Sequence, residues 1–332
     1  MNTQLLAPFS WILATSAALL IFAAEAAAAQ STSILKFPTK PIRLIVPFPP
    51  GGSNDILGRV LGQKLGEKLQ QITIVDNRPG ADGIIGTEIV SRATPDGHTI
   101  LLVSTSYTMN PAIHKLPYDP IKSLAPVSMI AQGPNVITAA PGFAASTIKD
   151  LIGMAKARPG HIRYASSGVG GFNHFSGELF NSMAGVKMTH IPYKGGSPAM
   201  LDVMTGQVEI TFGTLIQAMP HIRSGKLKAL GVGSPRRSPA APSVPTIAEA
   251  GVPGYDGTIW WGILAPAGVP GPVISKLNVT IGDILRDPDM AKRLNAEAAE
   301  PVIESAAVFA KLIASDISKW ARIAKEAGIE AH

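Results

Sequence analysis

The fold of this chain is decided by a stretch near its N-terminus, which reads IRLIVPFPPGGSND over residues 42–55. The first seven residues form a mainly apolar run, which is typical of a β-strand buried on both faces. Pro and Gly then end the strand, and Ser53 is placed to cap a helix. The apolar residues that follow are spaced three and four apart and give that helix one core-facing side: Leu57, Val60, Leu61, Leu65 and Leu69.

Strands and helices alternate beyond this helix. Residues 72–75 and 98–104 are predicted strands, and between them a turn at residues 77–83 leads into a helix that ends near residue 93. Strands that alternate with helices pair in parallel through right-handed crossovers, with helices on both faces of the sheet. The order βαβαβ therefore predicts an α/β fold.

A second α/β unit is predicted from the middle of the chain. Helices are expected to begin at Thr147, near His174 and at Ser197-Pro198, where Ser caps the helix and Pro takes its first position. After WWGILAP at residues 260–266 the chain is predicted to be helical to its end, and residues 307–327 are rich in helix formers. The strands of this part are expected at residues 162–166, 188–192, 208–212 and 228–234.

Composition excludes several classes of protein. A chain of 332 residues with 46% hydrophobic residues can form two domains, each with its own core. It has no Cys, so disulfides, Cys-based zinc sites, iron–sulfur clusters and cysteine nucleophiles are excluded. The net charge of +6 is scattered, without a block of cations, which argues against a nucleic-acid partner and favours the encounter of small anions with a cleft.

The N-terminus has the pattern of an export signal. The apolar run WILATSAALLIFAA at residues 11–24 is followed by Glu25 and four alanines, a small-residue tract that predicts cleavage after Ala29. The run is short for a membrane span, and no Lys or Arg precedes it. The alternative is an uncleaved anchor helix. Both interpretations place the body of the protein outside the cytoplasm.

Three Gly-rich turns join predicted strands to predicted helices. They read VPFPPGGS at residues 46–53, SSGVGGFNH at residues 166–174 and IPYKGGS at residues 191–197. Glycines let backbone N–H groups approach a ligand, and a helix N-terminus adds unpaired donors that favour a carboxylate. Such turns also serve as plain connections, but three of them in two units favour a ligand cleft between the units.

Motifs of catalysis and of cofactor binding are missing from the sequence. GVGGFN at residues 168–173 has Asn at the third Gly of the dinucleotide fingerprint, and neither a P-loop nor a G-x-S-x-G elbow occurs. No pair among the seven His has the spacing of metal ligands on a helix. We therefore predict no catalytic residues, no metal and no cofactor; a periplasmic hydrolase or lyase would need a base and a nucleophile that the sequence does not offer.

Four conspicuous residues have both a functional and a structural interpretation. His174 can donate to an anion or bind nearby backbone. Asp55 can contact a ligand or favour the helix dipole from the first turn. Trp260 and Trp261 fit burial in the core or in the wall between domains better than ligand contact.

Eight blocks, taken in order, closely resemble the periplasmic solute receptors of tripartite tricarboxylate transporters, the Bug-type family. This resemblance implies a type II periplasmic-binding-protein fold, in which two doubly wound α/β domains are joined by two crossover segments. It divides the chain into a signal peptide (1–29), domain 1 (30–136 plus 259–332) and domain 2 (137–258). The blocks are VPFPPGGSNDILGR, NRPGADGIIGTEIV, TPDGHTILL, Asn110-Pro111, LPYDP, HIPYKGGSPAMLDVMTGQVEITF, VPTIAEAGVPGYDG and WWGILAPAGVP.

The family binds a carboxylate in its cleft through two of these turns, and its site is carried over residue by residue. The first turn contributes Phe48, Gly51, Gly52, Ser53 and Asp55, and the second contributes Ser167, Gly168, Gly170, Gly171 and His174. Amino-acid-binding members resemble one another in an acidic residue where this chain has Gly213. The resemblance therefore implies a carboxylate without an amino group, with aromatic, dicarboxylic and tricarboxylic acids as the options. This chain also departs from the family at Asn54 and Gly58.

The function that the resemblance implies is capture of this anion in the periplasm. A monomeric receptor without enzymatic activity closes over the ligand and delivers it to a membrane permease of one large and one small integral subunit. The alternative is a sensor or adaptor that presents the same liganded fold to a membrane signalling protein.

Overall fold

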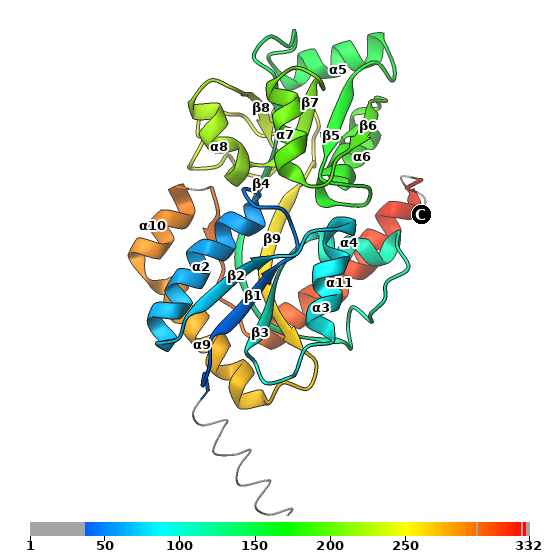
Figure 1. The fold of residues 1–332 in the computed structure, drawn as a ribbon. Helices are drawn as coiled ribbons and strands as arrows, with labels where there is room; N and C mark the ends of the chain where they lie inside the picture. The colour runs from blue at the N-terminus through cyan, green and yellow to red at the C-terminus, as the bar shows by residue number, and fades with distance from the viewer. Residues whose placement is uncertain (1–36, 297, 327, 330–332) are drawn as a thin grey trace, which may run out of the picture.

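The computed structural model describes residues 37–296, 298–326 and 328–329, so the predicted signal peptide lies outside the described residues. Two lobes lie end to end (Figure 1). We call the half with strands β1, β2, β3 and β9 the first lobe and the half with strands β5 to β8 the second lobe. Hydrogen bonds connect the main strands in the order β2-β1-β3-β9-β4-β7-β5-β6, with β8 and β10 paired to β4.

The first lobe confirms the βαβαβ prediction. Strand β1 (Ile42–Val46) pairs in parallel with β2 (Thr73–Asn77) and with β3 (Thr99–Ser104). Helix α2 (Ser53–Leu69) and helix α3 (Ile84–Ser91) connect them.

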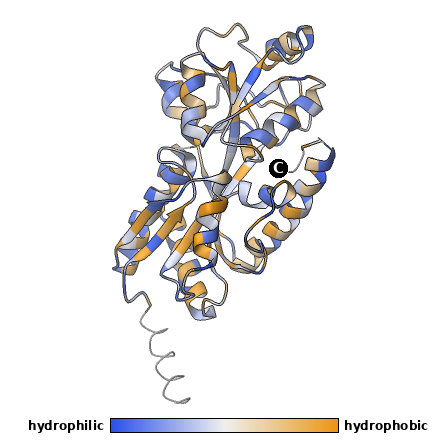
Figure 2. Ribbon diagram, turned by 45° about the vertical axis from the view of Figure 1, so that its right-hand side comes forward, coloured by the Kyte–Doolittle hydropathy of each residue, from blue (hydrophilic) through white to orange (hydrophobic). Residues whose placement is uncertain are grey.

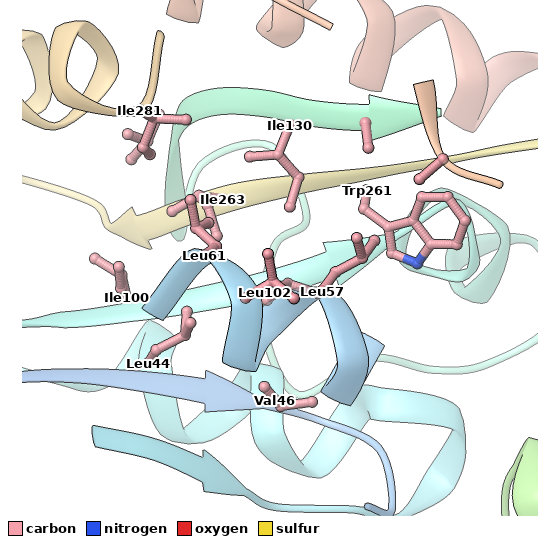
Figure 3. Close-up of a cluster of buried hydrophobic side chains, with 14 of the residues drawn as sticks. Leu44, Val46, Leu57, Leu61, Ile100, Leu102, Ile130, Trp261, Ile263 and Ile281 are labelled. Carbon is pink, nitrogen blue, oxygen red and sulfur yellow. The ribbon is translucent and has the colours of Figure 1, made fainter. Parts of the chain in front are cut away.

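Both faces of this sheet are covered by helices, as predicted. On one face Leu44 and Val46 share a buried cluster with Leu57 of α2, and on the other Ile45 packs with Ile84 of α3. In Figure 3, side chains of α2 point onto Leu102 of β3. Figure 2 shows hydrophobic residues concentrated on the strands of this lobe.

Strand β4 (Leu124–Ala139) passes from one lobe to the other. It pairs antiparallel with β9 (Thr258–Pro266) as far as Pro134, and from Asn135 it pairs with β7 (Ile210–Thr214) and β8 (Lys228–Val232). The sequence did not reveal β4, because it contains two prolines and a glycine and its register shifts twice against β9. The division into domains at residues 136/137 and 258/259 stays a prediction.

The second lobe is again α/β. Strand β5 (Arg163–Ser166) pairs in parallel with β6 (Thr189–Pro192) and with β7. Its helices are α5 (Ile148–Ala157), α6 (Phe172–Ala184), α7 (Gly196–Met204) and α8 (Leu215–Arg223). Thr147 caps α5 through a complete capping box with Asp150, which confirms that predicted helix start.

The remaining elements complete the first lobe. They are the short helices η1 (Ala81–Gly83), α4 (Ser106–Met109) and η2 (Asn110–Ala112), followed after β9 by α9 (Gly271–Arg286), α10 (Pro288–Ala296), β10 (Glu300–Pro301) and α11 (Ala306–Glu326). Within the described ranges, none of the helices combines the length and apolar character that crossing a membrane requires.

Two predicted serine caps are wrong. Helix α2 starts at Ser53 itself and has Gly52 as its N-cap, and α7 starts at Gly196 with Gly195 as its N-cap. The hydroxyl of Ser197 instead donates a hydrogen bond to the carbonyl oxygen of Pro50 in the other lobe, at 3.1 Å. Tertiary contact therefore takes the hydroxyl that local sequence assigned to the cap.

Candidate functional site

A small cleft of about 40 Å³ lies between the lobes. Its polar side chains are hydroxyls and amides, and no charged residue is among those that line it. The lining comes from the β1–α2 turn, the end of β3, the start of α4, the turn before α6, and the starts of α7, α8 and β9: Phe48, Pro49, Gly52, Ser53, Asn54, Ser104, Ser106, Ser167, Phe172, Asn173, Gly196, Thr214, Gln217 and Ile259.

Four helix N-termini meet at this cleft. Helix α2 begins at Ser53, α6 at Phe172, α7 at Gly196, and α8 follows its N-cap Thr214. The first N–H groups of a helix have no partner within the helix, and the helix dipole places a partial positive charge there. Neutral donors and four positive helix ends therefore make the cleft complementary to an anion, without any cationic side chain.

Asp55 holds the β1–α2 turn in shape. Its Oδ2 accepts hydrogen bonds from the Gly51 N–H at 2.9 Å and from Arg59 Nε at 3.0 Å, and its Oδ1 accepts one from Asn77 Nδ2 at 3.0 Å. The same Asn77 Nδ2 donates to the carbonyl oxygen of Phe48 at 3.0 Å. Gly51 has a φ of +83°, which favours glycine. The carboxylate thus fixes the backbone whose donors face the cleft.

The hydrogen bonds to Asp55 make stability depend on pH. Burial raises its pKa, but the bonds from Arg59, Gly51 and Asn77 outweigh burial and leave the pKa below the ordinary value. Because the folded-state pKa is lowered, the stabilisation is present above the unfolded pKa and is lost as pH falls through the folded pKa. We expect Asp55→Asn to cost about 1–3 kcal/mol of unfolding free energy at neutral pH.

The expected pH profile is measured by urea unfolding. Below about pH 4 the unfolding free energy of the parent should fall more steeply than that of Asp55→Asn, so the two curves converge. Asp283→Asn removes a carboxylate that is 55% exposed and serves as the matched control. Parallel curves for the parent and Asp55→Asn would contradict this account.

The turn before α6 is fixed by serine and histidine side chains. The Ser166 hydroxyl donates to the Gly168 carbonyl at 2.9 Å and lies 2.5 Å from His190 Nε2. His174 Nδ1 accepts the Gly170 N–H at 3.1 Å, and its ring stacks on that of His190 with centroids 3.9 Å apart. Burial and the nearby His174 lower the pKa of His190 to about 3, so His190 is neutral. His174 therefore acts on the turn's backbone in this structure.

Contacts between the lobes close the cleft. Besides the bond from Ser197 to Pro50, the Phe172 N–H donates to Ser106 Oγ at 3.1 Å, and His114 Nε2 lies 3.2 Å from the Val169 carbonyl oxygen. These contacts join the two Gly-rich turns of the second lobe to the first lobe and explain the small volume of the cleft.

A larger cavity of about 600 Å³ adjoins the cleft. It shares Phe48, Pro49 and Ser167 with the cleft, so these three residues lie between or beside the two spaces. Its other lining residues come from the β2–α3 turn, the loop after η2, the turn before α6 and the β6–α7 connection: Pro79, Gly80, Ala81, Asp82, Gly83, His114, Gly168, Val169, Pro192, Tyr193, Lys194 and Gly195.

The structure brings the predicted site residues together between the lobes, but only some of them line the cleft or the larger cavity. Phe48, Gly52, Ser53 and Ser167 line the cleft, and Gly168 lines the larger cavity. The residues that instead shape the two turns are Gly51, Asp55, Gly170, Gly171 and His174. Gly213 lies on β7, where an added Cβ would meet the Met200 methyl at 3.1 Å; its neighbour Thr214 lines the cleft.

Sequence reasoning did not find the donors from the other elements. Ser104 ends a predicted strand and Ser106 follows it, so the rule that ligands bind at the carboxyl ends of strands could have identified them. Thr214 is the N-cap of α8 and Gln217 lies in its first turn, and the sequence did not reveal this helix. Trp261 is buried as predicted, and its Nε1 donates to Asn54 Oδ1 of the cleft at 2.9 Å.

Comparisons with a family model, with known sequences and with solved structures all find solute receptors of one family. The model of the tripartite tricarboxylate transporter family receptor matches residues 57–329. Protein BugT of Bordetella pertussis is 37% identical over 311 residues, which cover 93% of this chain and 95% of the relative. The structure of R. palustris Rpa4515 with adipate is 33% identical with a TM-score of 0.87 and covers 89% of this chain and 100% of its own. That of the periplasmic binding protein BugD is 34% identical with a TM-score of 0.85 and the same coverage.

Proposed function

Because the chain belongs to the family of tripartite tricarboxylate transporter receptors, we propose that it captures a small carboxylate in the cleft between its lobes and delivers this anion to a membrane permease for uptake. The family consists of periplasmic substrate-binding receptors and not of enzymes. We further propose cleavage of the signal after Ala29, action as a monomer, and a permease of one large and one small subunit.

The observation that carries the ligand class is the convergence of four helix N-termini on a cleft without charged side chains. A carboxylate held by several charge-assisted hydrogen bonds, each worth about 1.5–3 kcal/mol, can supply the roughly 8 kcal/mol of a micromolar complex. Adipate, named with the R. palustris structure, is itself a small carboxylate. No acidic side chain lines the small cleft itself, so an ammonium next to the bound carboxylate would have no counter-ion there.

A thermal-shift screen tests this proposal. The exported chain is heated with aliphatic, aromatic, dicarboxylic and tricarboxylic acids, with amino acids and primary amides as contrast sets. A ligand at about 100 times its dissociation constant adds about 2.7 kcal/mol of stability, so binding acids should raise the melting temperature clearly while the matching amides should not. If only amides or amino acids raised the melting temperature, the proposed ligand class would be wrong.

A further inference from the structure

The β2–α3 turn places an unusual carboxylate between the lobes. Asp82 and its neighbour Ala81 have φ values of 47° and 46°, in the left-handed region that favours glycine. Both carboxylate oxygens of Asp82 are buried, and neither has a hydrogen-bond partner among the described residues. The turn is bound through its backbone instead, because Asn110 Nδ2 donates to the Asp82 carbonyl oxygen at 3.2 Å.

The second lobe covers this carboxylate. A Cβ on Gly171 would lie 2.8 Å from Asp82 Oδ1 and 2.9 Å from Oδ2, so only the bare glycine backbone allows this approach. Burial raises the pKa of Asp82 to about 7; the hydroxyls of Ser106 and Ser167 lie close enough to lower it, but neither forms a well-aligned hydrogen bond. No ion pair found among the described residues includes Asp82.

Asp82 lies on the wall of the larger cavity, which is otherwise mostly apolar. Phe48, Pro49, Pro79, Ala81, Val169 and Pro192 contribute apolar surface to that wall. The other titratable residues on it are His114, which contacts the Val169 carbonyl, Tyr193, whose hydroxyl donates to Asp202, and Lys194, which is exposed. A solvated Lys at an exposed position offers little to a buried anion.

The positions of the small cleft and the larger cavity determine how a ligand would bind. A carboxylate in the small cleft leaves the rest of the ligand to extend past the shared Phe48, Pro49 and Ser167 into the larger cavity. A volume of about 600 Å³ is within the range of pockets that enclose a small organic molecule. A second carboxylate there would be repelled by the Asp82 carboxylate, whose charge is poorly screened because both of its oxygens are buried in that wall.

Resting on the proposed function, we propose that Asp82 is a specificity-determining residue that excludes a second carboxylate from the larger cavity, so that the ligand is a monocarboxylate with an apolar, ring-sized body. An unpaired charge placed against the wrong ligand is a known means of discrimination. The small cleft selects the carboxylate, and Asp82 selects what is attached to it.

The test compares matched acids that differ by one carboxylate. Benzoate with terephthalate and hexanoate with adipate are titrated calorimetrically into the parent chain at about pH 8, where Asp82, with a pKa of about 7, is ionised. We expect the monocarboxylate of each pair to bind at least about tenfold more tightly. In Asp82→Asn this ratio should fall to about threefold or less, because the dicarboxylates gain affinity.

Two further variants make the result decisive. Asp82→Gly removes the charge and suits the left-handed backbone, so it reports on the charge even if Asp82→Asn folds poorly. Asp283→Asn, at an exposed position, should leave both ratios unchanged. The inference is overturned if the parent binds dicarboxylates as tightly as monocarboxylates, or if neither Asp82 variant changes the ratios. It is also overturned if neither benzoate nor hexanoate binds while other carboxylates do. A chain that binds no carboxylate of any kind would instead refute the proposed function.

Discussion

Gly52→Val is expected to abolish carboxylate binding and to leave the fold intact. Gly52 is the N-cap of α2 and lines the small cleft, with φ −80° and ψ 168°, an extended conformation that valine also adopts. A Cβ there would have Pro49 O, at 3.7 Å, as its nearest contact. Three added carbon atoms beside a cleft of about 40 Å³ leave no room for a carboxylate at the end of α2. We expect affinity to fall by at least about 100-fold.

The matched control for this variant is Gly153→Val. Gly153 is exposed in α5, and an added Cβ there meets nothing within 4 Å. Gly52→Val should cost about 1 kcal/mol of unfolding free energy, because glycine is a clearly better N-cap than valine. Gly153→Val should be nearly neutral, because valine is no worse than glycine at an exposed helical position. Calorimetric titration should then show loss of binding in Gly52→Val alone. Retention of binding within about threefold in that variant would place the carboxylate elsewhere.

Gly233→Ala is expected to cause the largest loss of stability. Gly233 N–H donates to the Asn135 carbonyl at 2.9 Å, and Gly257 N–H donates to the Gly233 carbonyl at 2.6 Å, where β4 and the start of β9 pass between the lobes. The buried Asn135 side chain fills the space beside both glycines and donates to the Tyr255 hydroxyl at 3.0 Å. An added Cβ on Gly233 would lie 1.7 Å from Asn135 Oδ1. The overlap should cost about 3 kcal/mol of unfolding free energy.

A double-mutant cycle identifies the cause of this loss. Asn135→Ala removes the amide that the new Cβ would meet, so Gly233→Ala should cost at least about 1 kcal/mol less in that background than in the parent. Gly142→Ala, where an added Cβ meets nothing within 4 Å, should be nearly neutral. Urea unfolding of the parent, the two single variants and the double variant gives the four unfolding free energies of the cycle. Additive effects of the two substitutions would contradict the role assigned to Asn135.

Local sequence predicts the strands and helices of this protein well where burial and capping decide them. The apolar run that became β1 and the Thr147 capping box of α5 are examples. Local sequence failed at β4, because its two prolines and its glycine argue against a strand, although all three positions pair with β9. It also failed at Ser197, whose hydroxyl is bound by the other lobe. In both places the decisive partner is distant in sequence.

In the candidate site, too, local sequence predicts some residues, and others depend on contacts with residues distant in sequence. The three Gly-rich turns were visible as motifs, and their residues Gly52, Ser53, Ser167 and Gly196 line the cleft. The contributions of Thr214 and Gln217 depend on how the second lobe closes onto the first, which no local pattern encodes. Asp82 is the clearest example, because the backbone of Gly171 in the other lobe approaches its buried carboxylate closely.

Helix N-termini in the cleft are expected to bind the carboxylate group of the ligand because of its negative charge. The most direct measurement is a calorimetric titration of the parent chain with the best acid from the thermal-shift screen and with its primary amide, which has nearly the same shape and no charge. We expect the acid to bind with micromolar or tighter affinity and the amide to bind at least about 100-fold more weakly, a difference of about 2.7 kcal/mol. Equal affinities for the acid and the amide would contradict this expectation.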